Sequence, residues 1–283
     1  MSGELVKEMT RMPAVGLGRS AFAVASACLA IWNLAYAHFA WQGLPGWIPG
    51  REAWVYGSAL VLLAASAALF LSRTALAGAL VIGVYQAVSF SIFVPQIVSK
   101  PLGVDVWYPV CEALTASAGA WILYVLLQRQ SHGAGEAITG VGVVRTAQIL
   151  FGLTCVFYGW SHFVYAAYTA GMVPGWLPGR LPLAYFTGFG HIAAGVAIIV
   201  GILPGLAATL EAVMMSLFGL LVWVPSFFAQ PPPKWATPPA HQWSELVVTL
   251  VLAASAWIVA ISFGRRQHVS PVTAQASMPG QRN

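Results

Sequence analysis

Apolar residues occur along the chain in long runs, separated by short segments rich in polar residues, glycine and proline. Crossing the hydrocarbon core of a bilayer, about 30 Å thick, takes roughly 20 apolar residues in a helix. Because lipid cannot hydrogen-bond to a bare backbone, and because no alternating barrel pattern is visible, each run is predicted to be an α-helix. The pattern predicts an all-α polytopic membrane protein with eight transmembrane helices, at residues 20–42, 53–72, 75–98, 107–128, 146–170, 183–202, 205–228 and 243–263.

The composition agrees with a membrane location. Hydrophobic residues make up 59% of the 283 positions and charged residues 7%, whereas soluble domains carry about one quarter charged residues. The formal charge of +5 comes from thirteen Lys and Arg residues that are scattered singly along the chain, so they form no nucleic-acid-binding patch. The first run is too long for the apolar part of a signal peptide, and its equivalent recurs in mid-chain. The expected partner is a lipid bilayer, and a nucleic acid is not expected.

The distribution of basic residues predicts the orientation of the chain. With eight spans, both termini share one side with the loops that follow the second, fourth and sixth spans. Nine of the thirteen Lys and Arg residues lie on that side, and the other side holds only Arg51, Lys100, Arg180 and Lys234. Because basic loops are retained in the cytoplasm, both termini are expected to be cytoplasmic.

The chain contains an internal repeat. VPGWLPGR at 173–180 matches LPGWIPGR at 44–51, and the match continues on both sides, with AHF paired with SHF and FVPQIVSKP with WVPSFFAQP. An even number of spans in each copy makes the copies parallel, related by an axis along the membrane normal. We therefore predict two parallel four-helix-bundle repeats. The expected divisions are a tail and first repeat at 1–127, a cytoplasmic linker at 128–144, a second repeat at 145–264 and a polar tail at 265–283.

The two octapeptides are predicted to form stiff loops on the outer side of the membrane. Their prolines fix φ and remove backbone donors, so neither flanking helix can extend through them. Trp47 and Trp176 are suited to the membrane interface, and Arg51 and Arg180 are placed to reach lipid headgroups. These features favour a structural rim over each bundle, and a lid over a ligand site is the alternative.

Ionisable residues inside the spans are candidate functional residues because they are costly in a bilayer. Each repeat carries one histidine late in its first helix and one glutamate early in its fourth, at similar depth. We expect His38 to face Glu112 in the first repeat and His162 to face Glu245 in the second. Each pair could be a hydrogen-bonded clasp between helices or part of a functional site.

The second repeat contains more candidate chemistry. His191 lies inside its second helix, and His241 is four residues before Glu245, on the same helix face. His162, His191, His241 and Glu245 could therefore converge on one polar site. Such a set could handle protons or bind a quinone headgroup, bind a metal through its three histidines, or form ordinary interhelical hydrogen bonds.

Two further polar residues within the spans favour structural roles. Glu211 lies about six residues into a helix that starts on the cytoplasmic side. The first copy has an apolar residue at the matching position, near Val81. We expect Glu211 to extend toward the cytoplasmic interface. Gln86, in the middle of the third span, is expected to form a hydrogen bond between helices.

The order of these motifs resembles the DoxX family of bacterial inner-membrane proteins. The second half, about 145–263, has a first helix ending in His162-Phe163, a proline-tryptophan connection, Tyr185-Phe186-Thr187-Gly188 at the start of a small-residue-rich helix, and Val224-Pro225 at the end of the third. The first half shows the resemblance more faintly. The resemblance implies a four-helix bundle in the bacterial cytoplasmic membrane, with the octapeptides on the periplasmic side. Relatives include the small subunit of thiosulfate:quinone oxidoreductase. Many DoxX-like sequences carry a glutamate where this chain has His191.

Three functions are compatible with these features. The resemblance implies a quinone-linked or an accessory membrane role. The first function is quinone-linked redox chemistry at the outer side of the bilayer, with quinone as the expected cofactor. The sequence has no flavin, haem or iron-sulfur motif, so electrons would pass through a partner. The second function is a non-catalytic accessory subunit that binds other membrane subunits through the proline-rich loop at 227–243. The third is a small-molecule or ion carrier, although no broken helix marks a transport site.

Overall fold

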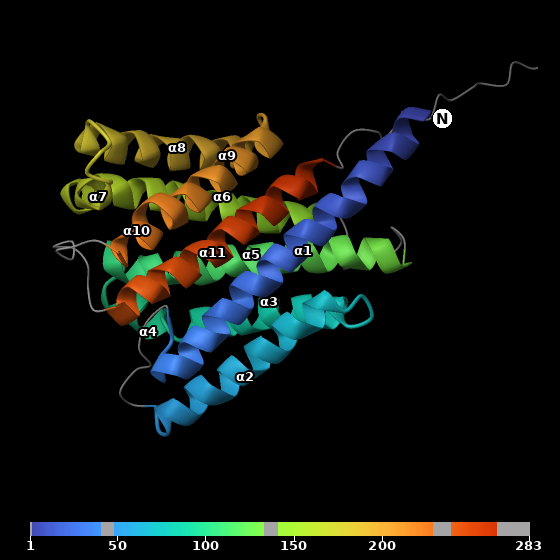
Figure 1. Ribbon diagram of the computed structural model, residues 1–283, viewed down its shortest axis with the longest axis horizontal. Helices are drawn as coiled ribbons and strands as arrows, with labels where there is room; N and C mark the ends of the chain where they lie inside the picture. Colours follow the sequence, from blue (N-terminus) through green and yellow to red (C-terminus); the bar gives the residue numbers. More distant parts are fainter. Residues whose placement is uncertain (1, 41–47, 133–140, 229–238, 265–283) are drawn as a thin grey trace, which may run out of the picture.

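All regular structure in the described part of the chain is helical. The computed structural model describes residues 2–40, 48–132, 141–228 and 239–264. The helices, shown in Figure 1, are α1 (Ser2–Tyr36), α2 (Arg51–Phe70), α3 (Ala75–Ser91), α4 (Val94–Ser99), α5 (Val104–His132), α6 (Val141–Val164), α7 (Ala166–Met172), α8 (Arg180–Val200), α9 (Pro204–Phe218), the π-helix η2 (Gly219–Trp223), α10 (Val224–Ser226) and α11 (Pro239–Phe263).

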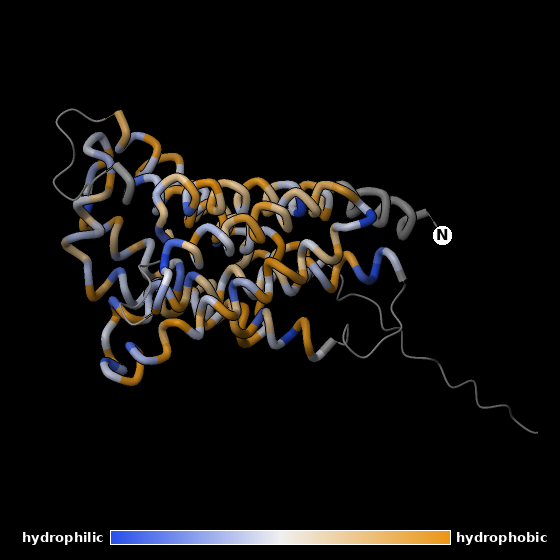
Figure 2. Tube along the Cα trace, turned by 90° about the horizontal axis from the view of Figure 1, so that it is seen from below, coloured by the Kyte–Doolittle hydropathy of each residue, from blue (hydrophilic) through white to orange (hydrophobic). Residues whose placement is uncertain are grey.

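Eight helical segments in this part are long and apolar enough to cross a membrane, so the predicted all-α fold and number of spans are confirmed. Figure 2 shows hydrophobic residues along their lengths. The segments are Ala14–Tyr36, Arg51–Phe70, Ala75–Ser99, Val104–Ser131, Gly142–Val164, Arg180–Val200, Pro204–Ser226 and Gln242–Phe263. The main difference from the predicted boundaries is at Tyr165, where the predicted fifth span is divided into α6 and the short helix α7.

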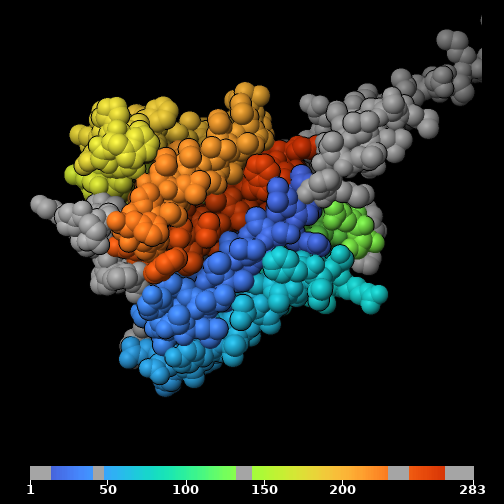
Figure 3. Space-filling model, viewed as in Figure 1, coloured from blue at the N-terminus to red at the C-terminus, as the bar shows by residue number. Residues whose placement is uncertain are grey.

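Helices α5 and α11 form the centre of the molecule. Of their most apolar stretches, 78% and 72% of the residues are buried, against 44% or less in the other six spans. They pack against each other, and Figure 3 shows α11 between α1 and α9 on one face of the molecule. A Cβ added to Gly119 of α5 would lie 2.6 Å from the Cβ of Ser255 of α11. The two backbones therefore meet closely at this point.

Each of the two central helices packs against outer helices from both halves of the chain. Within the first four spans, α2 packs against α1 and α3, and α3 packs against α5. Within the last four, α8 packs against α6 and α9, and α9 packs against α11. However, α1 packs against α11 rather than α5, and α6 packs mainly against α8 and α5 rather than α11. The packing thus differs from two separately closed four-helix bundles, because the first helix of each half contacts the fourth helix of the other half.

The two halves bury their residues in the same register. The buried residues of α2 run from Val55 to Leu69, and each has a buried counterpart in α8, from Ala184 to Ile198, 129 positions later. The five buried residues of α9 follow five buried residues of α3, from Gly78 to Gln86, by the same 129 positions. This register pairs Leu62 with His191. It also pairs Ile82 with Glu211, so two buried positions that are apolar in the first half are ionisable in the second.

The Arg180 end is the end at which α2, α5 and α8 begin, on the left in Figure 1, and the Arg145 end is the opposite one. At the Arg180 end, Gly50 and Gly179 precede α2 and α8 with φ of 61° and 67°, a left-handed conformation that favours glycine. Both loops therefore turn into the following helix in the same way.

Enlarging Gly119 is expected to destabilise the protein. The methyl group in Gly119→Ala would overlap Ser255, and overpacking of this kind typically costs about 1–3 kcal/mol. Gly57→Ala is the matched control, because a Cβ at Gly57 would have no atom within 4 Å. Thermal unfolding in detergent should show a lower midpoint for Gly119→Ala only. Equal midpoints for both variants would contradict the close contact between α5 and α11.

Candidate functional site

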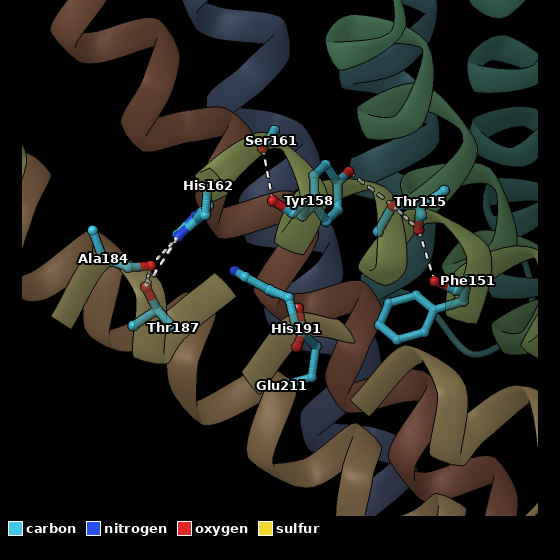
Figure 4. A network of polar contacts seen from close by, with 10 residues as sticks. Thr115, Phe151, Tyr158, Ser161, His162, Ala184, Thr187, His191 and Glu211 are labelled. Carbon is cyan, nitrogen blue, oxygen red and sulfur yellow. Dashed lines mark hydrogen bonds and ion pairs between the residues drawn. The ribbon is translucent and has the colours of Figure 1, made fainter. Parts of the chain in front are cut away.

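A buried pair of ionisable side chains lies between α8 and α9. The Nδ1 atom of His191 is 2.7 Å from Oε1 of Glu211, and each side chain is 1% exposed. At a rise of 1.5 Å per residue, His191 lies about 16 Å along α8 from the Arg180 end. Glu211 lies about 10 Å along α9 from the Arg145 end. The pair is therefore about halfway along α8, and Figure 4 shows its two side chains from close by.

One polar atom on each member of the pair lacks a partner. When Glu211 is ionised, its Oε1 atom accepts this hydrogen bond and the Nδ1 atom of His191 carries the hydrogen. Nε2 of His191 and Oε2 of Glu211 are buried and make no hydrogen bond of normal geometry within the described residues, and the Cys155 thiol of α6 lies beside the Glu211 carboxylate. A buried polar atom without a partner costs about 1–3 kcal/mol. In a native structure, such atoms point to a bound water, a ligand or a catalytic role.

Aromatic rings enclose the His191 imidazole. The ring centroids of His162, Tyr158 and Phe218 lie 5.1, 6.0 and 5.8 Å from that of His191. Phe218 also stacks on His162 at 5.9 Å. It is the last residue of α9, directly before the π-helix η2. Phe218 therefore contacts both histidines at a point where the helix changes its geometry.

Hydrogen bonds to α8 fix the orientation of His162. Its Nδ1 atom lies 3.0 Å from Oγ1 of Thr187 and 3.3 Å from the carbonyl oxygen of Ala184. The Thr187 hydroxyl donates to carbonyl oxygens of its own helix. The Nδ1 atom of His162 must therefore carry a hydrogen to satisfy these acceptors. When His162 is neutral, its Nε2 atom is the one that can accept a proton.

Tyr158 is positioned by a chain of hydroxyl groups that connects α6 to α5. Its hydroxyl lies 3.0 Å from Oγ1 of Thr115, which donates to Oγ1 of Thr154 at 2.8 Å. Thr154 in turn donates to the carbonyl oxygen of Phe151 at 2.8 Å. Since each hydroxyl has one hydrogen, Tyr158 donates to Thr115. The chain holds the tyrosine ring against His191, as Figure 4 shows.

The structure brings together only some of the residues that the sequence singled out. His162 and His191 are neighbours, but His162 forms no hydrogen bond with Glu245. Glu245 is half-buried and close enough to influence Tyr168, whose pKa is raised mainly by burial and then by this carboxylate. The backbone of His241 lies in α11, but its side chain is outside the described residues.

His38 and Glu112 make no hydrogen bond with each other. His38 is exposed and its Nδ1 atom lies 2.8 Å from the carbonyl oxygen of Phe39, whereas Glu112 is buried on α5. Glu112 instead lies within electrostatic range of Glu245 on α11. The 129-residue register pairs His162 with Asn33, which is fully buried. His38 matches His162 in the sequence motif, but it lies five positions after its structural counterpart.

The expectation that Glu211 extends to the interface is wrong, because its side chain is 1% exposed and paired with His191. The π-helix explains why the Val-Pro motif gives the wrong counterpart for Glu211 in the first half. Val224-Pro225 follow Val94-Pro95 by 130 positions, but the residues before η2 follow α3 by 129. Aligning the halves on the Val-Pro motif therefore placed Glu211 beside Val81. In the buried register its counterpart is Ile82, a core position.

Gln86 does not make the expected hydrogen bond between helices. It is fully buried on α3, and neither atom of its amide has a partner within the described residues. The predicted interfacial residues Arg51 and Arg180 are exposed at the first positions of α2 and α8. Trp176 is 71% exposed, while Trp47 lies outside the described residues.

The proline-rich segment and the proposed metal ligands are only partly described. Residues 229–238 lie outside the described part, and Phe227 and Trp243 stack on either side of it with ring centroids 4.2 Å apart. Among the side chains that the structure describes, no group of three or more His, Cys, Asp or Glu could hold a metal ion. No family model, curated protein or solved structure matches the chain.

The stability effects of changing His191 and Glu211 are expected to be strongly non-additive. His191→Leu or Glu211→Ile alone leaves one ionisable group buried without its partner, which typically costs about 3–5 kcal/mol. The double variant installs the residues found at the matching positions, Leu62 and Ile82, and should recover most of the lost stability. Thermal unfolding of the four proteins in detergent measures this effect. Additive losses would show that the pair does not act as a unit.

Proposed function

We propose that this chain is a DoxX-like integral membrane subunit that handles protons for quinone-linked redox chemistry. The observation that carries the proposal is the buried His191–Glu211 pair, with a free nitrogen on one member and a free oxygen on the other. Ionisable residues are rare inside membrane spans and commonly belong to proton relays or ligand sites. The quinone is the cofactor that the family resemblance implies.

The geometry of the pair supports proton transfer at a defined atom. An imidazole gains or loses a proton near neutral pH. Because the bond to Glu211 occupies Nδ1 of His191, proton uptake is directed to Nε2. The carboxylate then stabilises the imidazolium that forms. Reduction of a quinone takes up two protons with two electrons, so His191 would supply or accept protons while a partner subunit exchanges the electrons.

The division of the site between two helices departs from the pattern of the DoxX family. Many DoxX-like sequences place a glutamate at the position of His191, and here the acidic group is on the adjacent helix, at Glu211. The two side chains are in direct contact, so an acidic group is still present at this depth. In the proposal, the histidine adds a group that can carry the proton.

The proposal includes a duplicated four-helix unit in which only the second copy carries the site. The shared 129-residue burial register supports the duplication, with Leu62 and Ile82 at the positions of His191 and Glu211. The excess of basic residues on the side of the termini supports an orientation with the Arg180 end outside. The membrane would be the bacterial cytoplasmic membrane.

Quinone binding provides a direct test. With the full chain in lipid nanodiscs, decylubiquinone should quench tryptophan fluorescence in a saturable manner. In the double variant His191→Leu/Glu211→Ile, the apparent Kd should rise by on the order of tenfold or more, because a lost charge-assisted hydrogen bond costs about 1.5–3 kcal/mol. His38→Leu is the matched control, since His38 is exposed and, within the described residues, hydrogen-bonds to the Phe39 backbone. The proposal would be refuted if the quenching of the wild-type protein does not saturate, or if the double variant binds decylubiquinone with the same affinity as the wild type.

A further inference from the structure

His162 lies between the buried pair and the Arg180 end of the molecule. It is two residues from the end of α6, and its partners Ala184 and Thr187 are in the first two turns of α8. Its exposure is 9%, whereas that of His191 is 1%. The two rings are 5.1 Å apart between centroids. Figure 4 shows the His191 ring directed from Glu211 toward His162.

We propose that His162 relays protons between the His191–Glu211 pair and the Arg180 end, so that the pair exchanges protons with one side of the membrane only. This inference rests on the proposed function, and it adds the route and the residue that provides it. If the proposed orientation is correct, the side is the outer one.

The hydrogen bonds of the two histidines support this relay. Nδ1 of His162 is held by Ala184 and Thr187, and Nδ1 of His191 is held by Glu211. Each ring therefore has only Nε2 available for a mobile proton. In the transfer step, the N–H bond at Nε2 of His162 breaks and one forms at Nε2 of His191, directly or through one water. The positive charge moves next to the Glu211 carboxylate, and no electron is transferred.

Beyond the Cys155 thiol of α6, which lies beside the Glu211 carboxylate, the packing on the other side of the pair is apolar. Phe151 of α6, Ile198 of α8 and Ala208 of α9 are at most 1% exposed, and they lie toward the Arg145 end. Arg145 is bound to the carbonyl oxygens of Ile198 and Ile199 at the end of α8. The Cys155 thiol contacts Glu211 and not the His191 ring, and the hydrogen bonds and ring contacts of His191 among the described residues include no titratable side chain from this direction. The polar route from the pair therefore leads toward His162.

Other ionisable groups lie near this region on every neighbouring helix. Tyr108 and Glu112 of α5 and Glu245 of α11 form an electrostatically connected group, and Tyr108 contacts the ring of Tyr158. Among the described residues, the set comprises Tyr108, Cys111 and Glu112 on α5, Cys155 and Tyr158 on α6, Tyr168 on α7, His191 on α8, Glu211 on α9 and Glu245 on α11. Since the tyrosine and glutamate groups offer a competing route through Tyr158, the experiment must distinguish them from His162.

His162→Asn is a suitable variant because Asn33 occupies the matching buried position in the first half. An asparagine can keep a hydrogen bond to α8 but cannot carry a proton. Glu112→Gln tests the competing route, and His38→Asn is the matched control. Unfolding midpoints close to that of the wild type would verify that the variants are folded.

The test uses proteoliposomes that contain the full chain in one orientation. Vesicles with this orientation are selected with a C-terminal affinity tag. A pH jump is then applied separately to each side of the membrane. The probe is the infrared difference signal of His191, identified with isotope-labelled histidine and the His191→Leu variant. After a jump at the Arg180 side, His162→Asn should slow protonation of His191 by on the order of tenfold or more. Glu112→Gln and His38→Asn should leave the rate unchanged. Imidazole added at this side should restore the rate in His162→Ala.

The outcomes separate this inference from the proposed function. Equal rates in the wild type and His162→Asn, or faster protonation from the Arg145 side, would overturn the relay while leaving His191 a proton-handling residue. A slow rate in Glu112→Gln with a normal rate in His162→Asn would also overturn it and assign the route to the glutamates. If His191 does not change protonation between about pH 4 and 9 from either side, the proposed function fails as well.

Discussion

The close contact of α5 with α11 is the packing interaction on which the rest of the fold depends. Between apolar helices in lipid there is little hydrophobic driving force, so association relies on van der Waals contact where small residues let backbones approach. Gly119 and Ser255 provide such a point at the centre of the molecule. Every other long helix in the described part reaches this pair directly or through one neighbour. The contact thus joins the two halves and places α5 beside the helices that carry the polar site.

The polar site follows from this arrangement. His191 and Glu211 lie on α8 and α9, and α6 and α5 supply the histidine, tyrosine and threonines around them. Removing both charges from water is unfavourable, and their mutual hydrogen bond offsets only part of that cost. In the first half, Leu62 and Ile82 fill the same positions without this cost. The fold does not require an ionisable pair at this place, which is a physical reason to associate the pair with function.

The sequence was sufficient to predict the helices but not their partners. Long apolar runs determine the spans because a bilayer admits few alternatives, and all eight were found. The crosswise contacts of α1 and α6 could not be inferred, because a one-dimensional pattern does not specify which helices pack together. Of the site, His162 and His191 were identified from the cost of burying them. Glu211 was misplaced because one extra residue at η2 shifts the register, and His38 was aligned with His162 because the motif match concealed Asn33.

The contact between α1 and α11 also bears on how the protein is made. Pro239, where α11 begins, follows the end of α1 at Tyr36 by 203 positions. At about 5–20 residues per second, α1 waits on the order of 10 to 40 seconds for this partner to be synthesised. During that interval its α11-facing surface is open to lipid or to the insertion machinery. Assembly of the bundle can therefore be completed only after the last helix has entered the membrane.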